Sequence, residues 1–289
     1  IFVALATAIT VFVISASYSQ IIELFPTGGG GYLVASKLIS PNVGMVSGCA
    51  LMIDYLLTIT LSVASGSDAL FSFLPATWYP FKLEFSVFIL IFLILINMRG
   101  VKESVLPLVP LFFTFLITHI LIIVYAMVQN AGRLPAIVQS TAQDINITSQ
   151  EIGMWGMMLL IFRAYSLGAG TYTGIEAVSN GLSSLREPRV ETGKKTMTYM
   201  SISLAFTVVG LMMAYLFYGV QYQHGKTLNA VLFETASSSW GSWGSVFVLV
   251  SLVSEALILF VAAQTGFLGG PRVLANMALD RWLPMKFAS

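Results

Sequence analysis

SLGAGTYTGIEAVSNG, residues 166–181, decides how the rest of the chain is interpreted. The segment lies where a membrane-spanning helix is expected, yet it holds four glycines, two threonines and the carboxylate of Glu176. Hydrocarbon offers no water to loose backbone groups or to a lone charge, so both need surrounding protein or a water-filled cavity. The segment is therefore predicted to be a broken helix that lines a site for an ion or a small solute.

The composition defines the class of protein. The chain is 57% hydrophobic and 9% charged, whereas soluble domains carry roughly 25% charged residues. Apolar runs of about 20 residues, enough to cross a bilayer, recur along the whole length. These features predict an all-α integral membrane protein with a single transmembrane domain over residues 1–289. The seven expected spans are about 1–24, 43–66, 84–98, 104–128, 155–182, 196–220 and 244–269.

Basic residues are unevenly shared between the two sides of the membrane. The first, third and fifth loops and the C-terminal segment carry ten of them: Lys37, Arg99, Lys102, Arg186, Arg189, Lys194, Lys195, Arg272, Arg281 and Lys286. The other three loops carry Lys82, Arg133 and Lys226. Because cytoplasmic loops collect Lys and Arg, the N-terminus is predicted on the outer side of the membrane. A hydrophobic helix without a leader is hard to insert from outside, so we expect a span before Ile1 and more after Ser289.

A polar stripe runs along the second span, LMIDYLLTITLSVAS at residues 51–65. Asp54, Thr58, Ser62 and Ser65 stand at i, i+4, i+8 and i+11, which places them on one helix face, and Tyr55 lies beside them. A charged residue in mid-membrane is costly, so Asp54 indicates that the stripe faces the interior of the protein, next to a cavity. The two serines fit equally a binding site or a seam where helices approach closely.

The broken span supplies the complementary oxygens. Its glycines at 168, 170, 174 and 181 allow unwinding, which frees carbonyls to coordinate a cation. Thr171 and Thr173 add hydroxyls, and Glu176 adds a carboxylate. Such hard ligands suit alkali cations and protons. Asp54 and Glu176 lie on separate predicted helices. This arrangement indicates that one acid binds a cation and the other binds a proton or acts in a gate, and the sequence does not say which acid has which role.

Five weaker features complete the pattern. Glu255 in the last span is either part of the path or a buried, hydrogen-bonded acid, and His119 is interpreted as a packed or interface residue. The glycine-rich stretch 25–32 is either a flexible turn or a close backbone crossing, and its four consecutive glycines are not expected to be helical. Residues 129–154 are expected to form a long outer loop. Residues 271–287 are expected to form an amphipathic helix on the inner membrane face.

Three segments resemble signatures of the amino acid–polyamine–organocation (APC) superfamily of transporters. SYSQIIELFPTGGGGY at 17–32 resembles its second helix, GTYTGIEAVSNG at 170–181 its unwound sixth helix, and PRVLANMALDRWLP at 271–284 the helix after its eighth. The resemblance implies a LeuT-like inverted-repeat fold, of which this chain would be helices two to eight.

Within that superfamily, the sequence is similar to Kim-type potassium importers related to the KUP family. The resemblance rests on Asp54, Tyr55, Thr58 and Ser62 joined to Thr173 and Glu176. It implies a potassium site at Tyr55, Thr58, Ser62 and Thr173, with Asp54 and Glu176 as proton-linked acids. The implied activity is proton-coupled potassium symport by alternating access. Transported K⁺ and H⁺ would be the ligands, with no other cofactor and no nucleic acid, in a homodimer with a cytoplasmic regulatory domain.

Three other functions are considered. An amino acid permease of the same fold is the main alternative, although the hydroxyl-rich set favours a dehydrated ion. A complete seven-helix receptor fits the number of spans but not the glycine-broken fifth one. An enzyme is not expected, because no acid–base pair comes with a nucleophile or a set of metal ligands.

Overall fold

The computed structural model describes residues 1–26, 30–98, 108–182 and 185–288, except the side chain of Thr173. These residues are helical and contain no strand. The α-helices are α1 Phe2–Leu24, α2 Gly30–Val34, α3 Pro41–Phe71, α4 Lys82–Met98, α5 Leu108–Asn130, α6 Leu134–Leu167, α7 Thr173–Asn180, α8 Arg189–Tyr218, α9 Leu228–Ala236 and α10 Ser242–Leu279. A π-helical turn lies at Ala35–Ile39, and 3₁₀ turns lie at Ala76–Phe81, Ala131–Arg133, Ala169–Tyr172, Ser238–Trp240 and Met285–Phe287.

The helices confirm an all-α membrane protein. Six helical segments among the described residues are long and apolar enough to cross a bilayer. The fourth runs as one stretch from Leu108 to Leu167 and includes the residues expected as an outer loop. That expectation was wrong, because 129–154 is helical apart from a kink at Gly153, whose φ is 73°. The polar residues there extend the helix instead of breaking it.

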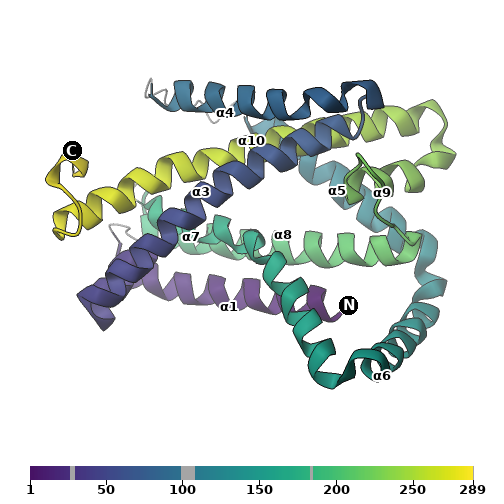
Figure 1. Cartoon of the computed structure of the whole chain (residues 1–289), viewed down its shortest axis with the longest axis horizontal. Helices are drawn as coiled ribbons and strands as arrows, with labels where there is room; N and C mark the ends of the chain where they lie inside the picture. Colours follow the sequence, from purple (N-terminus) through teal and green to yellow (C-terminus); the bar gives the residue numbers. More distant parts are fainter. Residues whose placement is uncertain (27–29, 99–107, 183–184, 289) are drawn as a thin grey trace.

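The centre of the bundle is the crossing of α3 and α10, which lie side by side in Figure 1. Glycines on both helices allow the close approach. A methyl group on Gly66 would lie 2.6 Å from Phe260, and one on Gly266 would lie 2.6 Å from Ile59. Small residues let helices pack tightly where hydrocarbon gives no hydrophobic drive for association. The α3–α10 pair is thus the rigid frame against which the polar residues of α3 are held.

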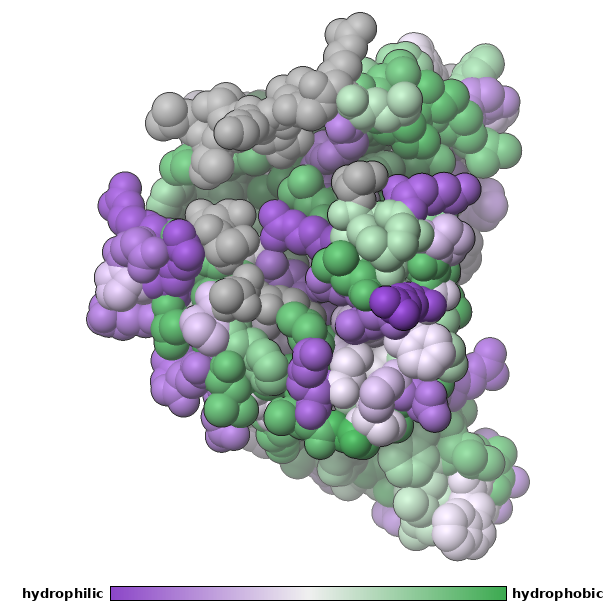
Figure 2. Space-filling view, turned by 90° about the vertical axis from the view of Figure 1, so that its left-hand side faces the viewer, coloured by the Kyte–Doolittle hydropathy of each residue, from purple (hydrophilic) through white to green (hydrophobic). Residues whose placement is uncertain are grey.

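The exposed surface fits a lipid environment. Leu93 is buried in α4, whereas Phe88 and Leu95 on the same helix are 63% and 54% exposed. Figure 2 looks onto the end of the bundle where α1 ends and α3 begins, and shows hydrophilic residues distributed over that end. Helix α8 begins and α10 ends there as well (Figure 1). The described residues after α1, before α8 and after α10, which the charge count assigns to one side, therefore share one end of the molecule.

The last helix is longer than the sequence indicated. Residues 271–287 do not form a separate amphipathic helix, because α10 continues through Pro271 to Leu279. Just beyond its end, the Asp280 carboxylate accepts a hydrogen bond of 2.7 Å from the Tyr32 hydroxyl. Burial, together with this bond, raises the pKa of Tyr32 to about 12. The end of α10 is therefore fastened to α2.

Candidate functional site

The predicted helix break is present. Helix α6 ends at Leu167, the 3₁₀ turn Ala169–Tyr172 follows, and α7 restarts at Thr173. Glycines at 168 and 170 lie in this junction, where a change of helix type is least costly for residues without a side chain. Helix α7 has Glu176 in its first turn, where the N-terminal end of the helix dipole favours a negative charge.

Asn180 joins the broken helix to α3. Its Nδ2 donates to the Tyr55 hydroxyl at 2.7 Å and reaches Glu176 Oε1 at 3.4 Å, one turn back on α7. Tyr55 is 6% exposed and its ring packs against Gly269 of α10. Two of the predicted site residues, Tyr55 and Glu176, are therefore brought together through an amide that the sequence did not single out.

Arg272 closes the C-terminal end of α7. Its Nη1 donates to the backbone carbonyl of Asn180 at 2.9 Å. Asn180 is the last residue of the helix, so its carbonyl has no partner within α7. A cation there also complements the negative end of the helix dipole. The guanidinium of α10 thereby fixes the position of the residue that holds Tyr55 and Glu176.

The backbone at the start of α2 approaches the carboxylate from another side. Gly30 adopts a φ of +51°, and a methyl group on it would overlap the Asn180 side chain. A methyl group on Gly31 would lie 3.8 Å from each of Glu176 Oε1, the Tyr18 hydroxyl and Ser47 Oγ. For Gly30 and Gly31 the structure therefore favours a close backbone crossing. Both lie in helix α2, contrary to expectation, and residues 27–29 lie outside the described part.

The remaining predicted residues are less tightly gathered. Asp54 is half-buried and close enough to Glu176 and Tyr18 for their charges to interact. Thr58 and Ser62 are half-buried farther along α3, and neither side chain bonds to another described residue. The side chain of Thr173 lies outside the described part of the structure. The structure thus groups Asp54, Tyr55 and Glu176, and leaves the roles of Thr58, Ser62 and Thr173 as predictions.

Three residues at this junction had not been picked out: Tyr18, Asn180 and Arg272. Each lies in one of the three recognised segments, 17–32, 170–181 and 271–284. Asn180 was also detectable from its spacing, because it stands at i+4 from Glu176 and so shares its helix face. Segments more than 90 residues apart therefore converge on one place, which residue chemistry alone did not reveal.

A cavity of about 240 Å³ adjoins this group and is lined by Tyr55, Asn180, Thr265 and Arg272 among others. It combines hydroxyl, amide and guanidinium groups with the apolar face of α10. In the described ranges, no three His, Cys, Asp or Glu side chains are grouped to hold a metal ion. The arrangement suits a hard monovalent cation, a proton or a small polar solute.

Membrane-spanning helices, one of them broken beside a half-buried carboxylate, are typical of secondary transporters. The chain belongs to the amino acid permease family, whose family model matches residues 1–289. It is also similar to the potassium transporter KimA of Bacillus subtilis (strain 168), with 29% identity over 286 residues. The match covers 99% of this chain and 45% of that protein, so the chain spans less than half of its relative's length.

Family membership decides among the functional classes considered. The chain is a multi-pass cell-membrane protein of a transporter family, and the families it matches are not enzymes. The seven-helix receptor interpretation is thereby overturned. The family model is described as an amino acid permease and the similar protein as a potassium transporter, so the substrate is argued separately below.

Proposed function

We propose that the full-length protein imports potassium together with protons by alternating access. The observation that carries the proposal is the Glu176–Asn180–Tyr55 junction, which sets a half-buried carboxylate and a buried phenol beside Asp54. An acid that is enclosed by three helices can exchange its charge for a cation or a proton without leaving an uncompensated charge in the membrane. The similarity to a potassium transporter adds support.

In this proposal, hydroxyl oxygens bind the potassium ion, and the two acids couple its transport to that of protons. Tyr55, Thr58, Ser62 and Thr173 supply hydroxyl ligands for K⁺. Glu176 is assigned to the proton, since Asn180 and the close backbone of α2 lie against its half-buried carboxylate. Asp54 on the facing helix is assigned to the cation. K⁺ and H⁺ are the only ligands proposed, and the assembly is proposed to be a homodimer.

An amino acid permease is the alternative. The family description favours it, and the cavity of about 240 Å³ beside Arg272 offers a cation to a substrate carboxylate. The two functions differ in what they need: an amino acid requires room for a side chain, whereas a dehydrated ion requires six or more oxygens, as in carbonyl-lined filters.

A complementation experiment distinguishes a potassium importer from an amino acid permease. The full-length protein is expressed in a strain that lacks its own potassium uptake systems, and growth is measured at low potassium alongside uptake of labelled amino acids. Restored growth with no amino acid accumulation supports the proposal. Absent growth with amino acid accumulation refutes it in favour of the permease, and an inactive Glu176→Gln variant controls for indirect rescue.

A further inference from the structure

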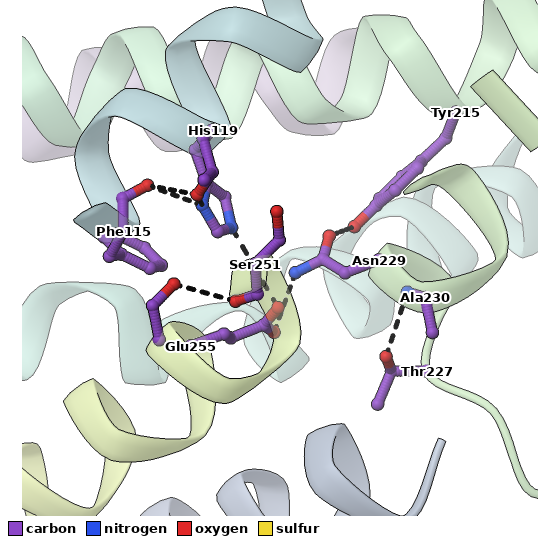
Figure 3. A network of polar contacts seen from close by, with 10 residues as sticks. Phe115, His119, Tyr215, Thr227, Asn229, Ala230, Ser251 and Glu255 are labelled. Atoms are coloured by element: carbon purple, nitrogen blue, oxygen red, sulfur yellow. Dashed lines mark hydrogen bonds and ion pairs between the residues drawn. The ribbon is translucent and has the colours of Figure 1, made fainter. Parts of the chain in front are cut away.

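A second buried polar cluster lies away from the junction at Glu176. Figure 3 shows the side chains of His119 from α5, Asn229 from α9 and Ser251 and Glu255 from α10 pointing toward one another. Asn229 Nδ2 donates to Glu255 Oε1 at 2.8 Å, and the Tyr215 hydroxyl of α8 donates to Asn229 Oδ1 at 2.5 Å. Four helices therefore meet at one carboxylate.

Three atoms of this cluster are buried and have no hydrogen-bond partner among the described residues: His119 Nε2, Ser251 Oγ and Glu255 Oε2. His119 is 1% exposed and Ser251 is fully buried. His119 Nε2 and Glu255 Oε2 are 4.0 Å apart, too far for a direct hydrogen bond. Buried polar groups nearly always have partners, so three of them around one point indicate a ligand.

The hydrogen bonds of His119 indicate which of its ring nitrogens carries a hydrogen, and so what the ligand must donate. His119 Nδ1 lies 2.8 Å from the Phe115 carbonyl, which only accepts, so Nδ1 carries a hydrogen. In the neutral ring Nε2 is then an acceptor, and it faces Glu255 Oε2, which is also an acceptor when ionised. Two acceptors aimed at the same point repel each other unless a proton, or a donor such as water, lies between them.

We propose that His119, Ser251 and Glu255 form a proton-binding site in which one water molecule bridges the three groups. A buried water typically makes about three hydrogen bonds to otherwise unpaired polar groups, which matches the three unpartnered atoms. Without the proton, water donates to Oε2 and Nε2 and the pocket holds the negative charge of Glu255. A proton taken from solvent neutralises that charge, which is costly to bury alone.

Few other ionisable side chains among the described residues lie near His119 and Glu255. The ionisable side chains that face Glu255 in the described residues are His119 from α5 and Tyr215 from α8. Helix α9 presents the neutral Asn229, and α3 presents Gly66 against Ala256 and Phe260 in this part of α10. The Lys226–Glu234 ion pair is partly exposed, with side chains 30% and 38% accessible. Proton binding therefore acts mainly on the charge of Glu255.

The site is separate from the proposed transport site. Glu255 precedes Gly269, which touches Tyr55, by fourteen residues of α10, or about 21 Å at 1.5 Å per residue. Because Asn229 holds the same carboxylate, binding of a proton changes the contact that fastens α9 to α10. The proposal therefore holds whether the transported substrate is potassium or an amino acid.

Infrared difference spectroscopy tests the site on the full-length protein in lipid nanodiscs, between about pH 8 and about pH 5. We expect a carbonyl band of a protonated carboxylic acid that grows on acidification and is lost in Glu255→Gln. Glu234→Gln, which alters a partly exposed acid on α9, retains that band. Loss of the band in Glu234→Gln instead would overturn the proposal.

The serines provide a matched pair that does not depend on folding of the Glu255 variant. Ser251→Ala removes the unpartnered hydroxyl and is expected to shift the band. Ser254→Ala removes a buried hydroxyl that already donates to the Ser251 carbonyl at 2.8 Å, and leaves the band in place. A spectrum of Ser251→Ala identical to that of the wild type, or a band that does not change across the pH range, overturns the proposal.

Discussion

Tyr55→Phe is the sharpest test of the junction at Glu176. The substitution keeps the ring, which packs so closely on Gly269 that a methyl group there would lie 2.6 Å from Cζ. It removes the hydroxyl that accepts the 2.7 Å bond from Asn180 Nδ2. The α3–α10 crossing should therefore survive, and the change removes the contact with Asn180 together with one of the hydroxyls proposed as K⁺ ligands.

The size of the effect follows from that contact. A lost hydrogen bond costs about 1 kcal/mol net, and leaving a buried donor unpaired raises the cost to about 1–3 kcal/mol. Asn180 retains its longer contact of 3.4 Å to Glu176, so a value near the lower end of that range applies. A loss of about 1–1.4 kcal/mol corresponds to roughly a five- to tenfold weaker apparent affinity. We expect the KM for the transported ion to rise by that factor, with kcat within about twofold.

The assay is uptake of labelled rubidium, as a potassium tracer, into cells that express the full-length protein without other potassium uptake. Tyr125→Phe is the matched control, because Tyr125 is half-buried and stacks its ring edge-on against Trp240, far from α7 in the sequence. The reasoning is refuted if Tyr55→Phe shows a KM within twofold of wild type at equal expression, or if Tyr125→Phe raises KM as much.

Two further predictions concern the same region. Glu176→Gln and Asp54→Asn should each abolish most uptake while expression stays near wild type, because they remove charge and keep shape; normal uptake by both would disprove the assignment of these acids. Gly269→Ala should lower the Tm of the purified protein by several degrees, since its methyl group would overlap the ring of Tyr55. Gly270→Ala should leave the Tm unchanged, because the atom nearest to a methyl group there is 3.8 Å away, on Met52. Equal changes in Tm for the two variants would show that helix propensity, and not the overlap with Tyr55, determines the result.

The fold was predictable where a single physical property dominates. Apolar length located most of the membrane-spanning helices, and the cost of glycine in a helix located the break between α6 and α7. Seven spans were expected, whereas the described residues contain six candidates, because one helical stretch runs from Leu108 to Leu167. Helix α10 also extends ten residues beyond the expected end at 269. The errors came where two properties compete. Residues 129–154 are polar and were expected to be a loop, yet they continue a helix. Residues 271–287 were expected to form a separate amphipathic helix, yet α10 passes through Pro271 to Leu279.

The site was predictable only in part, for a related reason. Helical spacing aligned Asp54, Thr58 and Ser62 on one face, because periodicity along one helix is visible in sequence. It says nothing of which residues on other helices meet that face. Asn180 and Arg272 contribute by satisfying backbone and side-chain groups of their neighbours, and such roles exist only once the helices are packed.

Arg272 has one role that is visible in the sequence, its charge, and a second that is visible only in the packed structure. The positive-inside rule counts it among the cytoplasmic basic residues, and on that count any basic residue at the position would serve. In the structure its Nη1 caps the last carbonyl of α7, and that helix carries both Glu176 and Asn180. A lysine there would keep the topological signal but would replace a planar, forked donor with a flexible point charge. Arg272 therefore has a structural contact at the end of α7 that a positive charge alone does not specify, while membrane topology requires only that charge.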